Sequence, residues 1–395
     1  MSDDLVPLSF QQEAGYRFLK NDGAHWFMPY AFRISGALQV NHLRNCLNSI
    51  VARHESLRTR IVLVRDQPMQ RIVALENDVL SIQDFTGHAA EDPEIVEAVE
   101  KLFRSEINLE TECVFVVRLL RLNDQEHVLA VAIHHMMFDR MSAVILFDEL
   151  WTLYENSVAA PILSPMKVQY RDYSSRQRHD HALWLSRHEA YWSRKLKGAQ
   201  PVRMPADPGQ REKPTNAAEL RFYLDSQSSL ALRQFASNKQ VFFGLVILTV
   251  FTMLIARWSG QYDFVLPFVV SGRDRPEHLR TIGWFAHCLF MRMQVGRTDT
   301  FTDLLEKTTA EFFTSWAHID GGRLAAICPV ELLYGTALQW VPWNPAEIQG
   351  APRRLLRAGN GEDEIKVQPF TVSDPPAADL RMDGEIGRAS CRERV

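Results

Sequence analysis

Strand-like and helix-like segments alternate along most of this 395-residue chain, and that alternation is the strongest constraint on its fold. Residues 31–38, 111–122 and 127–135 are rich in β-branched and aliphatic side chains, as strands are. Residues 42–57 and 142–156 instead space their apolar side chains three and four positions apart, as helices do. The pattern predicts a mixed fold of the α/β or α+β class.

The length of the chain predicts two lobes, because one domain usually takes about 100–200 residues. A hydrophobic content of 46% supplies enough apolar surface for a large core and argues against a disordered chain. Residues 161–216 are polar and punctuated by proline and glycine, which is typical of a junction. We therefore expect an N-terminal lobe over residues 1–178 and a C-terminal lobe over residues 179–386.

The longest stretch without a charged side chain is residues 240–256, between Lys239 and Arg257. It is shorter than the roughly 20 residues that cross a bilayer. Gly260 follows at the place where a helix C-terminus favours glycine. We interpret the stretch as a buried core helix rather than a membrane segment.

Charge and cysteine content exclude several classes of function. The chain has 44 basic and 48 acidic side chains, so no strong positive field favours nucleic acid or an anionic membrane. Its five cysteines include no Cys-x-x-Cys pair, which argues against a disulfide framework and a zinc site, and we expect no metal. The acidic N-terminus lacks the pattern of a signal peptide. These features predict a cytoplasmic protein.

A pair of histidines is the main candidate for chemistry. His134 and His135 end a strand-like run, and Asp139 follows just before an amphipathic helix. Because side chains alternate between the faces of a strand, only one of the two imidazoles can line a cavity. Asp139 is also a natural N-cap for the helix. From these residues alone, a positioned catalytic imidazole and a pair of satisfied core histidines both remain open.

Five motifs occur in order along the chain, and together they resemble the core motifs of the condensation domain of nonribosomal peptide synthetases. They are PLSFQQ (7–12), RHESLRTR (53–60), HHMMFD (134–139), QYRDYSSRQR (169–178), and SGRDRP with IGWFAHCLFMR (271–292). The resemblance extends from residue 7 over nearly the whole chain and includes AYWSRKLKGA and MPADP in the expected junction.

The resemblance implies a V-shaped pseudo-dimer of two chloramphenicol acetyltransferase-like lobes with a central tunnel. Two carrier proteins would bring their substrates into that tunnel on 4′-phosphopantetheine arms, and adenylation domains would be neighbours. The acceptor amine would attack the donor thioester carbonyl and form an amide. No cofactor would be bound directly by the chain itself.

The resemblance also assigns roles to individual residues. The second histidine of the motif, His135, would face the reacting atoms, in agreement with strand alternation, and His134 would pack behind it. Asp139 would be structural and paired with an arginine. By motif position the candidate arginines are Arg53, Arg58 and Arg273. The residues expected beside the tunnel or substrate are Ser9, Gln12, Arg140, Trp284 and His287.

The expected reaction needs few protein groups. A thioester is already activated, so holding two tethered reactants in register can lower much of the barrier. An α-amine with a pKa of about 8 is partly protonated near neutral pH, so an imidazole that accepts a proton or orients the amine is a suitable helper. The residues leave open whether His135 is a general base or a positioning group.

The chain departs from the family pattern at several motif positions. Arg140 replaces the glycine that follows the motif aspartate, and it places a cation at the first turn of a helix, where the helix dipole disfavours it. His287 replaces an asparagine, and Arg176 and Ile61 replace aromatic residues. The alternative to an active enzyme is therefore a degenerate domain that keeps the fold and docks a partner.

A second alternative is a coenzyme A-dependent acyltransferase of the same superfamily. Plant-type members of that group carry a DFGWG motif in their C-terminal half, which this sequence lacks.

The last nine residues, 387–395, do not show the periodic spacing of apolar side chains that marks a helix or a strand, and they resemble a translated cloning adaptor. On that interpretation the C-terminal lobe is truncated, whereas a natural basic tail is the other interpretation.

Overall fold

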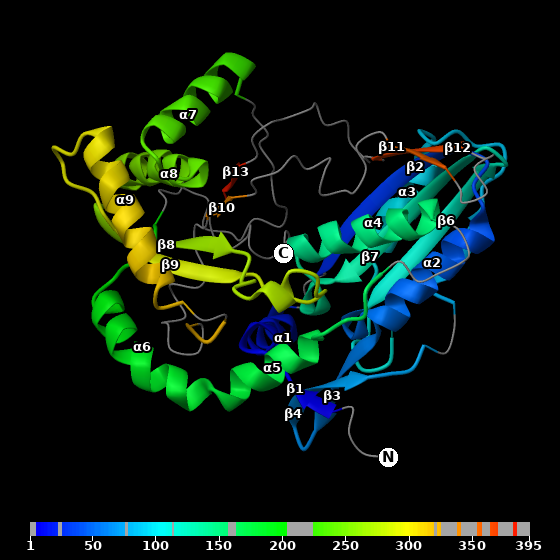
Figure 1. Ribbon diagram of the computed structural model, residues 1–395, viewed down its shortest axis with the longest axis horizontal. Coiled ribbons are helices and arrows are strands. Elements are labelled where there is room, and N and C mark those ends of the chain that lie inside the picture. Colours follow the sequence, from blue (N-terminus) through cyan, green and yellow to red (C-terminus); the bar gives the residue numbers. More distant parts are fainter. Residues whose placement is uncertain are drawn as a thin grey trace, which may run out of the picture. The chain divides into compact units, whose positions relative to one another are not determined.

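The computed structural model describes residues 5–22, 26–75, 78–112, 114–156, 163–203, 224–319, 322–324, 338–340, 354–357, 364–369 and 382–384. The chain divides into two compact units, which are described separately below (Figure 1). Unit 1 comprises Met1–Arg178, Arg273–Phe285 and Pro345–Pro376. Unit 2 comprises His179–Gly272, Ala286–Asn344 and Ala377–Val395.

Unit 1 is built on a six-stranded sheet with the order β11-β12-β2-β7-β6-β5. Neighbouring strands are antiparallel except β5 and β6, which are parallel. The strands are β2 (Phe27–Gly36), β5 (Leu80–Asp84), β6 (Phe115–Asn123), β7 (Glu126–His134), β11 (Arg354–Arg357) and β12 (Glu364–Pro369).

Helices cover both faces of this sheet (Figure 1). On one face, Phe27 and Ala31 of β2 join a core cluster with Ile95 and Val99 of α3 (Pro93–Phe103). On the other face, Phe32 packs against aromatic side chains of α4 (Arg140–Glu155). Strand alternation separates the two sets of side chains. Because both faces of the sheet are covered, β7 is buried almost throughout.

The rest of unit 1 surrounds this sheet. A second sheet has the order β1-β4-β3. Its strands are β1 (Leu5–Pro7), β3 (Thr59–Val64) and β4 (Gln67–Ile72). The remaining helices are α1 (Phe10–Asp22), α2 (Val40–Arg53) and α5 (Tyr170–His179), with short 3₁₀ turns η1 (Glu55–Arg58), η2 (His135–Met137) and η3 (Pro276–His278).

Unit 2 contains a four-stranded sheet with the order β13-β10-β8-β9. Its strands are β8 (Asp263–Val270), β9 (His287–Gln294), β10 (Leu338–Trp340) and β13 (Met382–Gly384). Its helices are α6 (His181–Leu196), α7 (Ser226–Asn238), α8 (Phe243–Ser259) and α9 (Phe301–Trp316). The prediction of a mixed α/β fold is confirmed.

Helix α8 occupies the long uncharged stretch and contributes most of its side chains to buried positions. It ends at Gly260, whose φ of 70° is left-handed and therefore favours glycine. Within the part of the chain that the structure describes, no single helix is long and apolar enough to cross a membrane. In the same described residues, α7 and α8 have that length and composition when taken together, but they are bent by 108°.

Neither unit is continuous in sequence. Arg273–Phe285 and strand β12 belong to unit 1 although both follow residue 178 in the chain. Strand β12 pairs antiparallel with β2, from Ile365 opposite Gly36 to Pro369 opposite Phe32. Local sequence patterns do not reveal such a return of the chain, because the pairing partners lie far apart in the sequence.

Candidate functional site

Asp139 connects η2 to α4 and lies at the centre of a buried polar network in unit 1. Its backbone is extended, and its Oδ1 accepts hydrogen bonds from the backbone N–H and the hydroxyl of Ser142, both at 2.8 Å. Asp139 is thus the N-cap of α4, and its negative charge lies at the positive end of the helix dipole.

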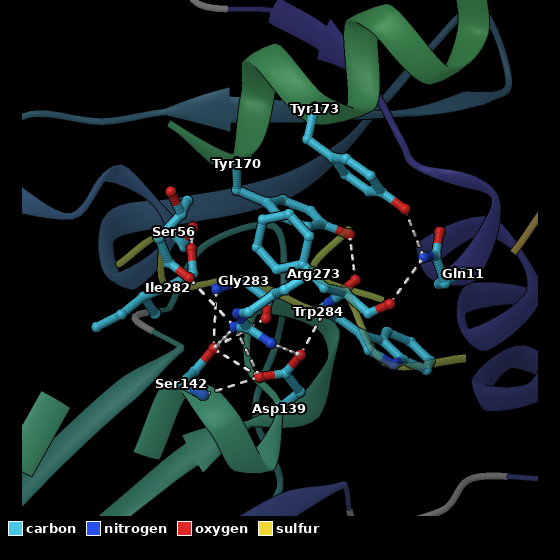
Figure 2. Close-up of polar contacts among 12 residues, drawn as sticks. Gln11, Ser56, Asp139, Ser142, Tyr170, Tyr173, Arg273, Ile282, Gly283 and Trp284 are labelled. Atoms are coloured by element: carbon cyan, nitrogen blue, oxygen red, sulfur yellow. Dashed lines mark hydrogen bonds and ion pairs between the residues drawn. The ribbon is translucent and has the colours of Figure 1, made fainter. Parts of the chain in front are cut away.

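Asp139 and Arg273 form a bidentate ion pair (Figure 2). The distances from Arg273 to the carboxylate are 2.8 Å for Nη1–Oδ2 and 3.0 Å for Nη2–Oδ1, and both side chains are 1% exposed. The backbone N–H of Phe285 also donates to Oδ2, at 3.0 Å. Burial alone would raise the pKa of Asp139, but the charge and hydrogen bonds of Arg273, with those of Ser142, outweigh it and hold that pKa below its usual range.

Ser142 joins helix α4 to the segment 273–285. Its hydroxyl oxygen accepts hydrogen bonds from Gly283 N and Arg273 Nη2, each at 3.0 Å (Figure 2). The same hydroxyl can donate one hydrogen bond, either to Asp139 or to the Gly283 carbonyl at 2.9 Å. A Cβ on Gly283 would lie 2.1 Å from the ring of Tyr170. Because that contact leaves no room for a side chain, the backbone approaches Tyr170 closely only with glycine at this position.

The two motif histidines lie in different surroundings. His134, the last residue of β7, is on the α3 side of the sheet, where its ring meets Phe27 edge-on at 5.7 Å between centroids. His135 begins η2, and its ring centroid lies 4.6 Å from that of Trp284 and 5.9 Å from that of Trp26. The backbone N–H of His135 donates to the Trp26 carbonyl at 2.7 Å.

The His135 imidazole is held neutral near pH 7. Burial lowers its pKa, and the nearby carbonyl groups of His135 and Phe138 and the charge of Asp139 only partly oppose that effect. Its Nδ1 is buried and makes no hydrogen bond of ordinary geometry to any described residue, although those carbonyls are close enough to act electrostatically. The residue as a whole is half-buried, and its accessible surface lies away from the buried Nδ1. A neutral imidazole can accept a proton or a hydrogen bond.

His134 should make the stability of the protein depend on pH. Burial, and then the adjacent His135, lower its pKa to about 3, whereas an unfolded histidine titrates near a pH of about 6.5. As the pH falls from about 6.5 toward 3, the unfolded chain gains a proton that the folded chain refuses, so the free energy of unfolding decreases. Urea unfolding at pH 7 and pH 5 should show a larger decrease in the free energy of unfolding for the wild-type chain than for His134→Gln. Equal decreases would contradict the lowered pKa of His134.

Two of the three candidate arginines do not pair with Asp139. Arg53 contacts Glu149, with its Nε 3.2 Å from Oε2, and Arg58 lies 3.8 Å from Glu55. The expectation that either could be the partner of Asp139 is therefore corrected, and Arg273 alone of the three forms the ion pair. Arg53 ends α2 and Arg58 ends η1, where nearer carboxylates are within reach.

Ser9 and Gln12, which the resemblance places beside the tunnel or substrate, lie at the N-terminus of α1. Both are fully buried, and they cap α1 reciprocally: Gln12 N donates to the Ser9 hydroxyl at 3.1 Å, and Ser9 N donates to Gln12 Oε1 at 3.0 Å. Gln12 Nε2 also donates to the Met136 carbonyl at 3.0 Å. The two residues therefore anchor α1 to the turn that carries His135.

The other three candidates from the sequence have separate positions. Trp284 is half-buried beside His135, and Arg140 is half-buried at the first position of α4. Burial lowers the pKa of His135, and the charge of Arg140 adds a little to that effect. Burial raises the pKa of Tyr30, and the charge of Arg140 partly opposes that rise. His287 belongs to unit 2, where it begins β9 opposite Val270.

Sequence reasoning missed several residues that build the site. Ser142 had a local signal, since it lies three positions after the N-cap aspartate. Tyr170 lies in a recognised motif, and its hydroxyl donates to the Trp284 carbonyl at 2.6 Å. Trp26 and Gly15 carried no signal, because their contacts depend on α1 packing against distant segments. Among the residues described here, no group of three or more histidine, cysteine or acidic side chains could hold a metal ion.

The sequence matches the family profile described as "Condensation domain" over residues 2–321. A linear gramicidin synthase of Brevibacillus parabrevis is 30% identical over 329 residues, which cover 80% of this chain and 6% of that protein. Bacitracin synthase 1 of Bacillus licheniformis is 27% identical over 396 residues, which cover 96% of this chain and 7% of that protein. The chain thus spans less than a tenth of the length of either relative.

Solved structures share the fold. Holo-AB3403, a four-domain nonribosomal peptide synthetase bound to AMP and glycine, superposes with a TM-score of 0.76 at 16% sequence identity. The alignment covers 94% of this chain and 29% of that one. The fold of the chain is therefore one that occurs within a multidomain synthetase.

Proposed function

The chain belongs to the condensation-domain family of nonribosomal peptide synthetases, and we propose that it joins a carrier-bound acyl or peptidyl thioester to a carrier-bound aminoacyl group. The single observation that best supports this proposal is the neutral imidazole of the half-buried residue His135, which directly follows the end of β7. Such a group suits an amine nucleophile, since it can accept a proton or orient the neutral amine.

In the proposed reaction, the acceptor nitrogen attacks the donor carbonyl carbon. A C–N bond forms, the C–S bond to the donor arm breaks, and the proton lost by the amine ends on the departing thiolate. His135 accepts that proton or hydrogen-bonds the amine during attack. Asp139 takes no part in the transfer, because its oxygens accept hydrogen bonds from Arg273, Ser142 and the Phe285 backbone.

We propose that the partners are donor and acceptor carrier proteins, whose 4′-phosphopantetheine arms present the two substrates, with an adenylation domain as a neighbour. Units 1 and 2 would then correspond to the two chloramphenicol acetyltransferase-like lobes of the family, with the reaction taking place in a tunnel. The relatives named above are synthetases many times longer than this chain, which supports partners of this kind.

A direct assay tests the proposal. The purified chain is mixed with a donor carrier loaded with a panel of acyl groups (acetyl, octanoyl, benzoyl and a dipeptidyl group) and an acceptor carrier loaded with glycine or phenylalanine. Mass spectrometry of the acceptor arm detects an amide product. We expect product with at least one pair, and binding of both carriers without any product would favour a non-catalytic docking domain instead.

Arg140 is the observation that favours that second function, because it replaces the family glycine with a half-buried cation at the start of α4. If its side chain obstructs the pantetheine arm, Arg140→Gly should raise the amide-forming turnover. Stability should change little, since glycine loses about 0.5–1 kcal/mol through backbone entropy while removal of the cation relieves the helix dipole. Turnover and thermal melts of the two proteins check the prediction.

Arg140→Lys is the matched control, because it keeps the charge and most of the length. It should leave turnover near that of the wild-type chain. An Arg140→Gly protein that binds both carriers and still makes no amide would rule out obstruction and favour the docking function.

A further inference from the structure

Among the residues that the structure describes, no carboxylate forms a hydrogen bond that would orient the His135 ring. A catalytic imidazole is commonly oriented by a hydrogen bond to its second nitrogen. The Nδ1 of His135 makes no such bond to any of the described residues. The nearest acid in sequence, Asp139, instead accepts hydrogen bonds from Arg273 and Ser142. Contacts with neighbouring rings can therefore add to whatever orientation the nearby carbonyls of His135 and Phe138 give the imidazole.

Two indole rings contact the imidazole. The Trp284 ring lies 4.6 Å from it, tilted by 52°, and the Trp26 ring lies 5.9 Å from it, tilted by 46°. The indoles also contact each other edge-on, at 5.7 Å and 80°. Because His135 N donates to the Trp26 carbonyl, both the backbone and the ring of His135 rest on the same tryptophan. We call Trp26 and Trp284 the indole clamp.

Each indole is itself held in place. The Trp284 backbone is fixed through its carbonyl, which accepts from Tyr170, and through the preceding Gly283, whose N–H donates to Ser142. Trp26 is buried and stacks on Phe18 of α1 at 5.2 Å. The Trp284 backbone and the Trp26 ring are thus each fixed by their neighbours.

Gly15 of α1 is the position where both indoles meet the helix. A Cβ built on Gly15 would lie 2.6 Å from Trp284 Cζ3, 2.9 Å from Trp284 Cη2 and 2.7 Å from Trp26 Cζ3. All three distances are shorter than real Cβ contacts, so the indoles would have to shift. Alanine has the higher helix propensity, so helix propensity favours alanine at residue 15 whereas packing against the two indoles favours glycine.

We infer that the indole clamp orients His135 and that Gly15 is a positioning residue, since only glycine there leaves room for both indoles beside the imidazole. The inference rests on the proposed function of His135 and deepens it. A methyl group at residue 15 would not touch the His135 imidazole, but it would displace that ring by moving Trp26 and Trp284. Misplacement by about 1 Å of a catalytic group can cost about 100-fold in rate.

The test compares Gly15→Ala with the wild-type chain in the amide-forming assay and by NMR of the protein labelled with ¹³C at histidine Cε1, with His135→Gln used to assign the signal. We expect kcat to fall about 10- to 100-fold, KM for the loaded carriers to stay nearly constant, and the His135 signal to shift as the indole ring currents move. Arg17→Ala, an exposed change on the same helix, is the control and should alter neither kcat nor the signal.

Trp284→Phe provides a rescue, because phenylalanine lacks both Trp284 atoms that the new methyl group would meet. In the Gly15→Ala background it should recover part of kcat and move the His135 signal back. Trp284→Leu opens the clamp without adding bulk, so it should lower kcat and shift the signal even if Gly15→Ala does not fold.

The outcomes separate the inference from the proposed function. An unchanged His135 signal in both Gly15→Ala and Trp284→Leu overturns the clamp, as does a shifted signal with unchanged kcat. A wild-type chain that makes no amide overturns the proposed function. The NMR comparison is made without substrate, so it still decides whether the indoles and Gly15 determine the orientation of the His135 ring.

Discussion

Replacement of His135 by alanine is expected to lower the rate of amide formation at least about 100-fold, as for a positioned acid–base or hydrogen-bonding group. The neutral ring is the group that would accept the amine proton or orient the amine, and alanine can do neither. The folded state should survive, because the residue is only half-buried and its Nδ1 makes no hydrogen bond of ordinary geometry to a described residue. Single-turnover assays with loaded carriers, together with thermal melts, measure both effects.

The matched control is His134→Ala, the neighbouring residue of the same type. His134 is 3% exposed, its Nδ1 accepts from Met136 N at 3.2 Å, and its ring contacts Phe27. Its loss should therefore reduce stability more than the loss of His135 does. Near wild-type turnover in His135→Ala would remove His135 from the reaction, and equal melting temperatures of the two variants would contradict their different surroundings.

Asp139→Ala should have the largest effect on stability. It leaves the Arg273 guanidinium, 1% exposed, without its counter-charge, and breaking a buried ion pair from one side costs about 3–5 kcal/mol. It also removes the N-cap of α4. We expect a strongly destabilised or insoluble protein, measured by urea unfolding where enough folded protein remains.

Asp148→Ala on the same helix is the control for this experiment. Asp148 pairs with Arg280 at 2.8 Å, but the side chains are 50% and 66% exposed, so the expected cost is about 0–1 kcal/mol. Replacing both partners, as Asp139→Ala with Arg273→Met, should recover part of the lost stability because no unpaired charge stays buried. A stable but inactive Asp139→Ala protein would instead indicate a direct catalytic role.

The Asp139–Arg273 pair also has a defined pH dependence. Because the pKa of Asp139 in the folded chain lies below that of an unfolded aspartate, about 3.9, its contribution to stability is complete above that pH. The contribution is lost as the pH falls through the folded value. Protonation of Asp139 should therefore contribute to the acid unfolding of the wild-type chain. The double variant Asp139→Ala with Arg273→Met should lack that contribution to the pH dependence of stability.

Local sequence patterns were sufficient for much of the fold. A run of aliphatic and β-branched residues predicted β7, helical spacing predicted α4, and a charge-free run followed by Gly260 predicted α8 and its end. The N-cap role of Asp139 followed from its place before α4. These features depend on neighbours within a few residues, where strand and helix periodicity acts.

Tertiary structure alone decided which groups meet at the site. The sequence offered three arginines for Asp139, and the choice of Arg273, 134 residues away, depends on the segment 273–285 packing within unit 1. It also decided that Ser9 and Gln12 are buried caps and that Gly15 faces both indoles. Such contacts join residues far apart in the chain, and they form only when sheets and helices pack. Periodicity carries no information about them, because it records which face of an element is buried and not what covers that face.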